Sequence, residues 1–104
     1  METQNLDKKI RTIASTYLSL ISLLQKNQES SSFSTHSLNS YSKFCASVEI
    51  AFLSLPLPLR RIINNEFFYQ EYPGWWKIVY KKNQYLKLKD LAIRKFMEAY
   101  YEIN

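Results

Sequence analysis

The sequence predicts an all-α protein, and two of its features support that prediction. The first is a shortage of turn-forming residues, because one glycine and three prolines are the total among 104 residues, whereas compact β folds need many tight turns. The second is the spacing of the apolar residues, 46% of the chain, which recur three and four positions apart as on one face of a helix. We expect a single domain, residues 1–104, of about five helices: a helical hairpin over residues 4–55, then a helix-turn-helix with a long C-terminal helix over residues 56–104.

The first helix is expected over residues 4–27, with Thr3 as its N-cap. Its apolar stripe alternates steps of four and three residues: Leu6, Ile10, Ile13, Tyr17, Leu20 and Leu24. A serine-rich segment, residues 28–37, follows, and its short polar side chains compete for backbone hydrogen bonds. We expect a flexible loop there.

A second helix is expected to start after Leu38, with Asn39 or Ser40 as its cap. Its stripe repeats the spacing of the first: Tyr41, Cys45, Val48, Phe52 and Leu55. Pro56 and Pro58 then end it, because proline lacks an amide donor and restricts the residue before it. Two striped helices joined by a loop of about ten residues suit an antiparallel hairpin.

The second half of the chain is expected to hold three more helices, over residues 58–70, 75–80 and 84–103. The turn at residues 71–74 contains the only glycine, Gly74. One alternative stays open for residues 78–89, whose apolar and aromatic side chains could flank a β-hairpin turn at Asn83 and Gln84.

Positive charge is concentrated in this second half. The chain has a net charge of +5. Residues 1–55 hold five basic and four acidic side chains, a net of +1, whereas residues 56–104 hold nine and five, a net of +4. A polyanion such as nucleic acid is the usual partner of such a field, and an acidic protein surface is the alternative.

The last helix is expected to bury one face and to present a basic face. The inward stripe is Tyr85, Leu88, Ala92, Phe96, Ala99 and Ile103. The candidate nucleic-acid contacts lie outside that stripe: Lys81, Lys82, Asn83, Gln84, Lys87, Lys89, Arg94 and Lys95. With Asn83 as the cap, Gln84 and Lys87 would reach base edges and the remaining cations would meet phosphates. A basic face that is merely solvated is the competing interpretation.

Two stretches resemble region 4 of sigma factors. Residues 53–63, LSLPLPLRRII, place a leucine-proline element before a helix with arginines and paired aliphatics. Residues 80–85, YKKNQY, followed by Lys87, Lys89, Ala92 and Phe96, are similar to the recognition helix of sigma-region-4-like regulators, including the phage-related ArpU type and short proteins of AT-rich, wall-less bacteria. The resemblance covers about residues 41–100 and implies a helix-turn-helix that reads a promoter or operator.

The chain departs from that family pattern at two places. Lys82, Asn83 and Gln84 stand where the family usually has serine or threonine at the start of its recognition helix. The expected supporting helix, residues 75–80, opens with Trp75 and Trp76, where the family is usually polar. These departures affect the expected reading of a promoter or operator and not the expected fold. A helix-turn-helix that contacts a protein in place of DNA would have much the same sequence.

Other classes of function have little support in the sequence. His36 and Cys45 are single residues of their kind, so neither a zinc cluster nor an internal disulfide is expected. Cys45 lies on an apolar stripe and suits a buried small hydrophobe. Trp75 and Trp76 suit core or hinge packing better than a platform for bases or a ligand. No glycine-rich phosphate loop is available with one glycine.

We therefore expect a non-enzymatic, cytoplasmic protein without a cofactor or membrane segment, whose function is to bind DNA as a transcriptional regulator. The alternative is a small helical adaptor or structural subunit of a protein assembly. A protein partner, or a second copy in a homodimer, would pack on the stripe of residues 4–27.

Overall fold

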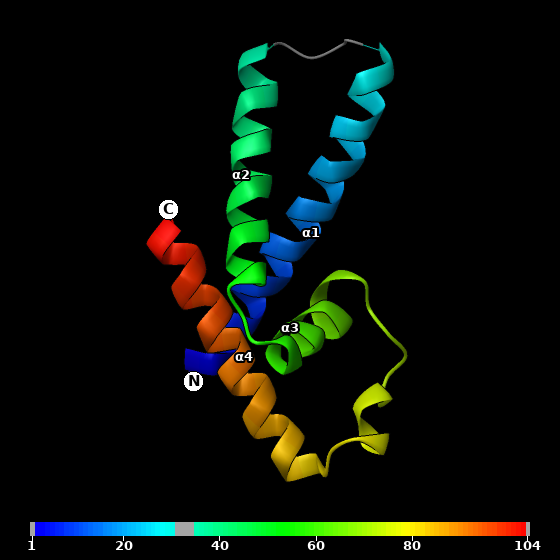
Figure 1. The fold of residues 1–104 in the computed structure, drawn as a ribbon, viewed down its shortest axis with the longest axis vertical. Helices are drawn as coiled ribbons and strands as arrows, with labels where there is room; N and C mark the ends of the chain where they lie inside the picture. Colours follow the sequence, from blue (N-terminus) through cyan, green and yellow to red (C-terminus); the bar gives the residue numbers. More distant parts are fainter. Residues whose placement is uncertain (1, 31–34, 104) are drawn as a thin grey trace.

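Figure 1 shows an all-α molecule, in a computed structural model that describes residues 2–30 and 35–103. In chain order the segments are α1 (Glu2–Ser30), α2 (Thr35–Leu53), α3 (Leu57–Ile63), the π-helical η1 (Asn64–Phe68), the single 3₁₀ turn η2 (Trp75–Ile78) and α4 (Lys82–Ile103). The predicted fold class is confirmed. No strand occurs within the described ranges, so the alternative β-hairpin over residues 78–89 is wrong.

The helices α1 and α2 form the predicted antiparallel hairpin, but both are longer than expected (Figure 1). The predicted loop over residues 28–37 is wrong at both ends, because residues 28–30 belong to α1 and residues 35–37 to α2. Its middle, residues 31–34, lies outside the described residues. Glutamine, lysine and glutamate at residues 25–29 are good helix formers and carry α1 onward.

The predicted caps of these two helices are also corrected by their bounds. Thr3 lies inside α1, and Asn39 and Ser40 lie inside α2, so none of the three caps a helix. His36 belongs to the first turn of α2 and not to a loop. Ser30 and Ser37 were expected to compete with helix formation, but they lie within α1 and α2.

The hydrophobic core lies where the base of the hairpin meets the second half of the chain. α1 packs against α2, α4 and η1, and α4 packs in addition against α2 and α3. The buried cluster is Ile10, Ala14, Val48, Ala51, Leu55, Leu59, Ile62, Ile63, Phe67, Phe68, Trp75, Tyr85, Ala92, Ile93, Phe96 and Met97. Burial of this apolar surface is the main favourable term in folding so small a domain.

The predicted helix over residues 58–70 is α3 followed by η1, which ends at Phe68. The buried pairs Ile62–Ile63 and Phe67–Phe68 lie five residues apart, and five residues is the hydrogen-bonding step of a π-helix. The wider turn therefore lets both pairs face the core. Sequence periodicity of three and four could not reveal that step.

The segment before α4 is shorter than predicted. Residues 75–80 were expected to form the supporting helix of a helix-turn-helix, but only Trp75–Ile78 are helical, as one 3₁₀ turn. Gly74 precedes that turn with φ of 80°, a backbone conformation that glycine adopts without the penalty of a side chain. The supporting element is thus a single turn held by aromatic packing.

The helix α4 begins at Lys82, two residues earlier than expected, so Asn83 lies inside the helix and does not cap it. Its predicted inward stripe is largely correct, since Tyr85, Ala92 and Phe96 are buried. Ile93 and Met97 are buried as well, and the prediction missed them. Ile103, placed in the stripe, is 40% exposed because α4 runs past its neighbours.

Candidate nucleic-acid interface

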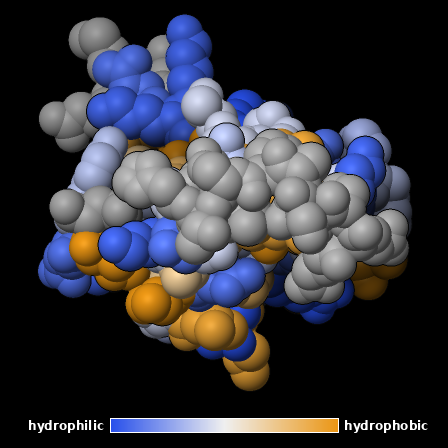
Figure 2. Space-filling model, turned by 90° about the horizontal axis from the view of Figure 1, so that it is seen from above, coloured by the Kyte–Doolittle hydropathy of each residue, from blue (hydrophilic) through white to orange (hydrophobic). Residues whose placement is uncertain are grey.

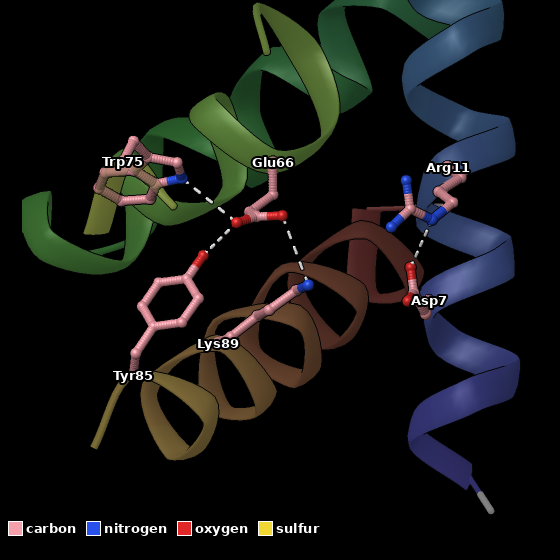
Figure 3. Close-up of polar contacts among 6 residues, drawn as sticks. All are labelled: Asp7, Arg11, Glu66, Trp75, Tyr85 and Lys89. Atoms are coloured by element: carbon pink, nitrogen blue, oxygen red, sulfur yellow. Dashed lines mark hydrogen bonds and ion pairs between the residues drawn. The ribbon is translucent and has the colours of Figure 1, made fainter. Parts of the chain in front are cut away.

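The carboxylate of Glu66 links the three segments that position the start of α4 (Figure 3). Its Oε1 accepts hydrogen bonds from the indole Nε1 of Trp75, at 3.2 Å, and from the phenol of Tyr85. Its Oε2 lies 3.4 Å from the ammonium Nζ of Lys89. We call these four residues, which come from η1, η2 and α4, the Glu66 hub.

Burial and hydrogen bonding fix the protonation states inside the hub. Burial by itself would raise the pKa of Glu66, but the hydrogen bond from Tyr85 and the charge of Lys89 outweigh it and lower that pKa. Burial, followed by the hydrogen bond to Glu66, raises the pKa of Tyr85. At neutral pH the hub therefore holds an ionised carboxylate and a neutral phenol that donates to it.

Aromatic stacking adds a second link between η2 and α4. The rings of Trp76 and Tyr85 are stacked, with centroids 4.5 Å apart and planes 5° apart. The ring of Trp75 meets Tyr85 edge-on at 5.7 Å. Trp75 is 6% exposed and belongs to the core, so its predicted role in packing is confirmed. Aromatic pairs of this geometry stabilise beyond their buried area.

Three of the predicted phosphate contacts are paired with carboxylates. Lys89 is bound to Glu66 in the hub, and its ammonium also lies 5.8 Å from the centre of the Phe67 ring. Arg94 pairs with Asp90 at 3.0 Å, and Lys95 approaches Glu98 at 4.0 Å. The basic face of α4 is therefore not a continuous positive strip.

The other five predicted site residues lie together at the start of α4 and are all exposed. They line one shallow hollow, and we call them the basic end: Lys81, Lys82, Asn83, Gln84 and Lys87. No acidic residue occurs anywhere between Gly74 and Leu88, a stretch that includes the exposed Lys77 as well. Figure 1 shows this end of α4 at the opposite extreme of the long axis from the far ends of α1 and α2.

Apolar side chains next to the basic end are exposed, which sequence reasoning missed. Ile78, on η2, is 88% exposed, and Val79, next to it in the chain, and Leu86, on α4, are exposed too, at 55% and 50%. Ile78 lies three residues after Trp75 and seven before Tyr85, as a buried residue of the same stripe would, so the spacing gave no signal of its exposure. Such residues rarely gather at a surface that contacts water alone.

A second hollow, largely apolar, lies between α1, α2 and η1. It is lined by Tyr17, Val48, Glu49, Phe52, Leu53, Asn64, Phe68 and Tyr69. The phenol of Tyr17 donates a hydrogen bond of 2.6 Å to Glu49 at its edge. Exposed hydrophobic residues also appear elsewhere on the surface, and the view along the long axis shows orange atoms gathered near one edge among hydrophilic ones (Figure 2).

The described part of the chain was also compared with the requirements of a metal site and of a membrane span. No set of three histidine, cysteine or acidic side chains there could bind a metal ion. Cys45 is buried, as predicted, and burial raises the pKa of its thiol. Among the same residues, no helix has both the length and the apolar character needed to cross a membrane.

Comparison with known proteins finds no family model, no curated protein and no solved structure that matches this chain.

Proposed function

We propose that this protein binds double-stranded DNA through the basic end of α4 and acts as a transcriptional regulator. The observation that supports the proposal best is the group of exposed lysines, Lys81, Lys82 and Lys87, in a stretch without any acidic residue. Lysines of this kind meet phosphates and release counterions from the duplex. The carboxylates that neutralise Lys89, Arg94 and Lys95 lie farther along α4 and on η1.

Asn83 and Gln84 give the basic end groups that can read bases. Both are exposed in the first turn of α4, and Lys87 follows Asn83 by four residues, so the two share one face of the helix. Amide side chains donate and accept at once, which matches the edge of adenine in the major groove. The base-reading set is therefore Asn83, Gln84 and Lys87, with Lys81 and Lys82 against phosphates.

The Glu66 hub supports this function by fixing the position of the basic end. Tyr85 is the buried residue of the first turn of α4, and it donates a hydrogen bond to Glu66 and stacks on Trp76. A helix held in this way loses little conformational entropy when it binds. More of the favourable contact energy therefore remains as affinity. Lys89 is accordingly a positioning residue in the hub rather than a phosphate contact.

The test is a titration of a fluorescent duplex of mixed sequence, followed by anisotropy over a range of salt concentrations. With two lysine–phosphate contacts, from Lys81 and Lys82, the logarithm of the association constant should fall with the logarithm of salt at a slope of about −2. The double variant Lys82→Glu/Lys87→Glu should lose most of the affinity. The matched control Lys8→Glu/Lys43→Glu makes the same change in net charge on exposed sites of α1 and α2 and should keep most of it.

Several outcomes would contradict the proposal. The proposal is wrong if the wild-type protein does not bind the duplex at low salt. It is also wrong if both double variants lose affinity for the duplex to the same extent. Vesicles of anionic lipid serve as a second probe, because lysines beside an exposed isoleucine also suit a lipid surface. Binding to vesicles without binding to the duplex would indicate that the ligand of the basic end is a membrane surface and not nucleic acid.

A second candidate function is that of an adaptor in a protein assembly, and the apolar hollow between α2 and η1 favours it. Leu53 and Tyr69 line this hollow and are largely exposed, and Leu57 is 71% exposed nearby in the chain. Exposed patches of this kind often mark protein contacts. If this function holds, Leu53→Glu and Tyr69→Glu should abolish capture of the partner, while Lys82→Glu/Lys87→Glu should leave it intact.

A further inference from the structure

The apolar hollow between α1, α2 and η1 is bordered by aromatic side chains from several directions. Half of its lining residues are aromatic: Tyr17, Phe52, Phe68 and Tyr69. The ring of Phe68 meets that of Tyr17 at 5.7 Å, with planes 77° apart, and that of Phe52 at 5.9 Å, with planes 66° apart. These three rings come from three different elements and lie at steep angles to one another. A ligand in the hollow therefore meets aromatic surface on more than one side.

The volume of the hollow limits what it can hold. It is about 210 Å³, below the roughly 300–1,000 Å³ that is typical of pockets for drug-sized ligands. The remaining walls are the aliphatic side chains of Val48 and Leu53 and the amide of Asn64. A ligand that fits is small, and most of its surface must be apolar to match these walls.

Glu49 gives this hollow a negative charge. It is the single charged residue among the described side chains that line it. Its carboxylate accepts the 2.6 Å hydrogen bond from Tyr17 and forms no ion pair in the described part of the chain, whereas the carboxylates that do form ion pairs lie on α1, η1 and α4. Burial, followed by the hydrogen bond to Glu49, raises the pKa of Tyr17, so that phenol stays neutral at pH 7.

Rings of this protein already accept cations on their faces. The guanidinium of Arg60 lies 5.9 Å from the centre of the Phe52 ring, although Arg60 does not line the hollow. The ring of Phe67 has two cations beside it, Arg11 at 5.0 Å and Lys89 at 5.8 Å. One contact with a cation therefore does not stop a ring from making a second. Such contacts are strongest where the cation is removed from water.

We propose that the apolar hollow binds a small organic cation, an ammonium ion that carries alkyl groups on its nitrogen. The alkyl groups contact the rings and the aliphatic walls, and the positive charge lies near Glu49 and the ring faces. A small inorganic cation would lose water that these walls do not replace. A neutral ligand would take water from the carboxylate and return no opposite charge.

The net charge of +5 does not oppose this ligand strongly. At physiological ionic strength, repulsion from distant lysines is screened beyond about 8 Å, whereas the carboxylate and the rings are in contact with the ligand. None of the lining residues belongs to η2 or α4, so the site is separate from the basic end. The inference does not depend on DNA binding.

A nuclear magnetic resonance titration of the full-length protein tests the proposal with two probes of the same shape. One is choline, and the other is the uncharged dimethylbutanol in which a carbon atom replaces the ammonium nitrogen. Choline should shift the methyl resonances of Val48 and bind with a dissociation constant on the order of 1 mM. The uncharged probe should bind about tenfold more weakly, because the two differ in charge and not in size.

Two variants test the groups that recognise the charge. Glu49→Gln keeps an acceptor for Tyr17 and should lower the affinity for choline about tenfold, while it leaves the affinity for the uncharged probe unchanged. Tyr69→Leu removes an exposed ring and keeps an apolar side chain, and it should lower the affinity for choline about threefold. The matched controls Glu71→Gln and Tyr72→Leu change exposed residues outside the hollow and should bind choline as the wild type does.

Three results would overturn the proposal. The first is the absence of any shift in the hollow at tens of millimolar choline. The second is equal affinity for the two probes, which would make the hollow an apolar groove suited to the protein partner of an adaptor. The third is an equal loss of affinity in Glu49→Gln and Glu71→Gln. Circular dichroism checks folding, which should be intact because Glu49 and Tyr69 are exposed.

Discussion

Glu66 joins three segments that lie far apart in the sequence, and its neighbours in the chain gave no sign of that role. Tyr85 is 19 residues away and Trp75 is nine residues away. No role was assigned to Glu66 from the sequence. The residue types around it were assigned by periodicity, which predicts burial along one helix but not hydrogen bonds between segments. The pairing of Lys89 with Glu66 was missed for the same reason.

Replacing Glu66 with glutamine should lower the free energy of unfolding at neutral pH by about 2 kcal/mol, because the amide is a weaker acceptor for Trp75 and Tyr85 and loses the charge that faces Lys89. Urea denaturation followed by circular dichroism measures the change. The control is Glu98→Gln, which alters an exposed carboxylate 4.0 Å from Lys95 and should change stability far less. A Glu66→Gln variant as stable as the wild type would show that the hub contributes nothing to folding.

The same hub makes stability depend on pH. The pKa of Glu66 is lower in the folded protein than its unfolded value of about 4.3, so folding favours the ionised form. This stabilisation is complete above the unfolded pKa and is lost as pH falls through the lower, folded-state pKa. The free energy of unfolding should therefore fall more steeply in wild type than in Glu66→Gln as the pH is lowered from about 6 to about 3. If the free energy of unfolding depended on pH in the same way in both proteins, Glu66 would not be the source of this pH dependence.

Among the elements, the long helices were predictable and the short connecting segments were not. Stripes at three and four residues predicted α1, α2 and α4 because burial of an amphipathic face decides where such helices form. The ends were misplaced wherever a residue with high cap preference, such as Thr3 or Asn83, lies inside a helix whose packing extends it. The π-helical turn of η1 and the 3₁₀ turn of η2 depend on tertiary contacts with no period of their own.

The junction between α2 and α3 has one side chain that holds it closed. Arg60 donates from its guanidinium to the backbone carbonyls of Leu53 and Leu55, at 2.9 and 3.1 Å, and lies 5.9 Å from the centre of the Phe52 ring. Arg60→Ala should destabilise the protein by about 1–2 kcal/mol, since carbonyls at the end of α2 lose their charged donor. Denaturant midpoints report the loss. Lys43→Ala, at an exposed site on α2, is the reference and should stay within about 0.5 kcal/mol of wild type.

At the scale of the whole molecule, charge and shape divide the protein between two ends. The sequence did predict that positive charge collects in the second half, because that needs only a count of side chains. It could not predict that Lys89 meets Glu66, since that depends on how η1 packs against α4. The pairs Arg94–Asp90 and Lys95–Glu98 lie within α4 at spacings of four and three residues, and counting side chains did not make use of those spacings.

The placement of the two tryptophans has a practical consequence. Both lie in η2, one bonded to Glu66 and the other stacked on Tyr85, and the chain contains no further indole. Ultraviolet excitation at the red edge of protein absorption therefore produces light from this junction alone. Its wavelength and intensity should follow events at the start of α4 in real time and without a label.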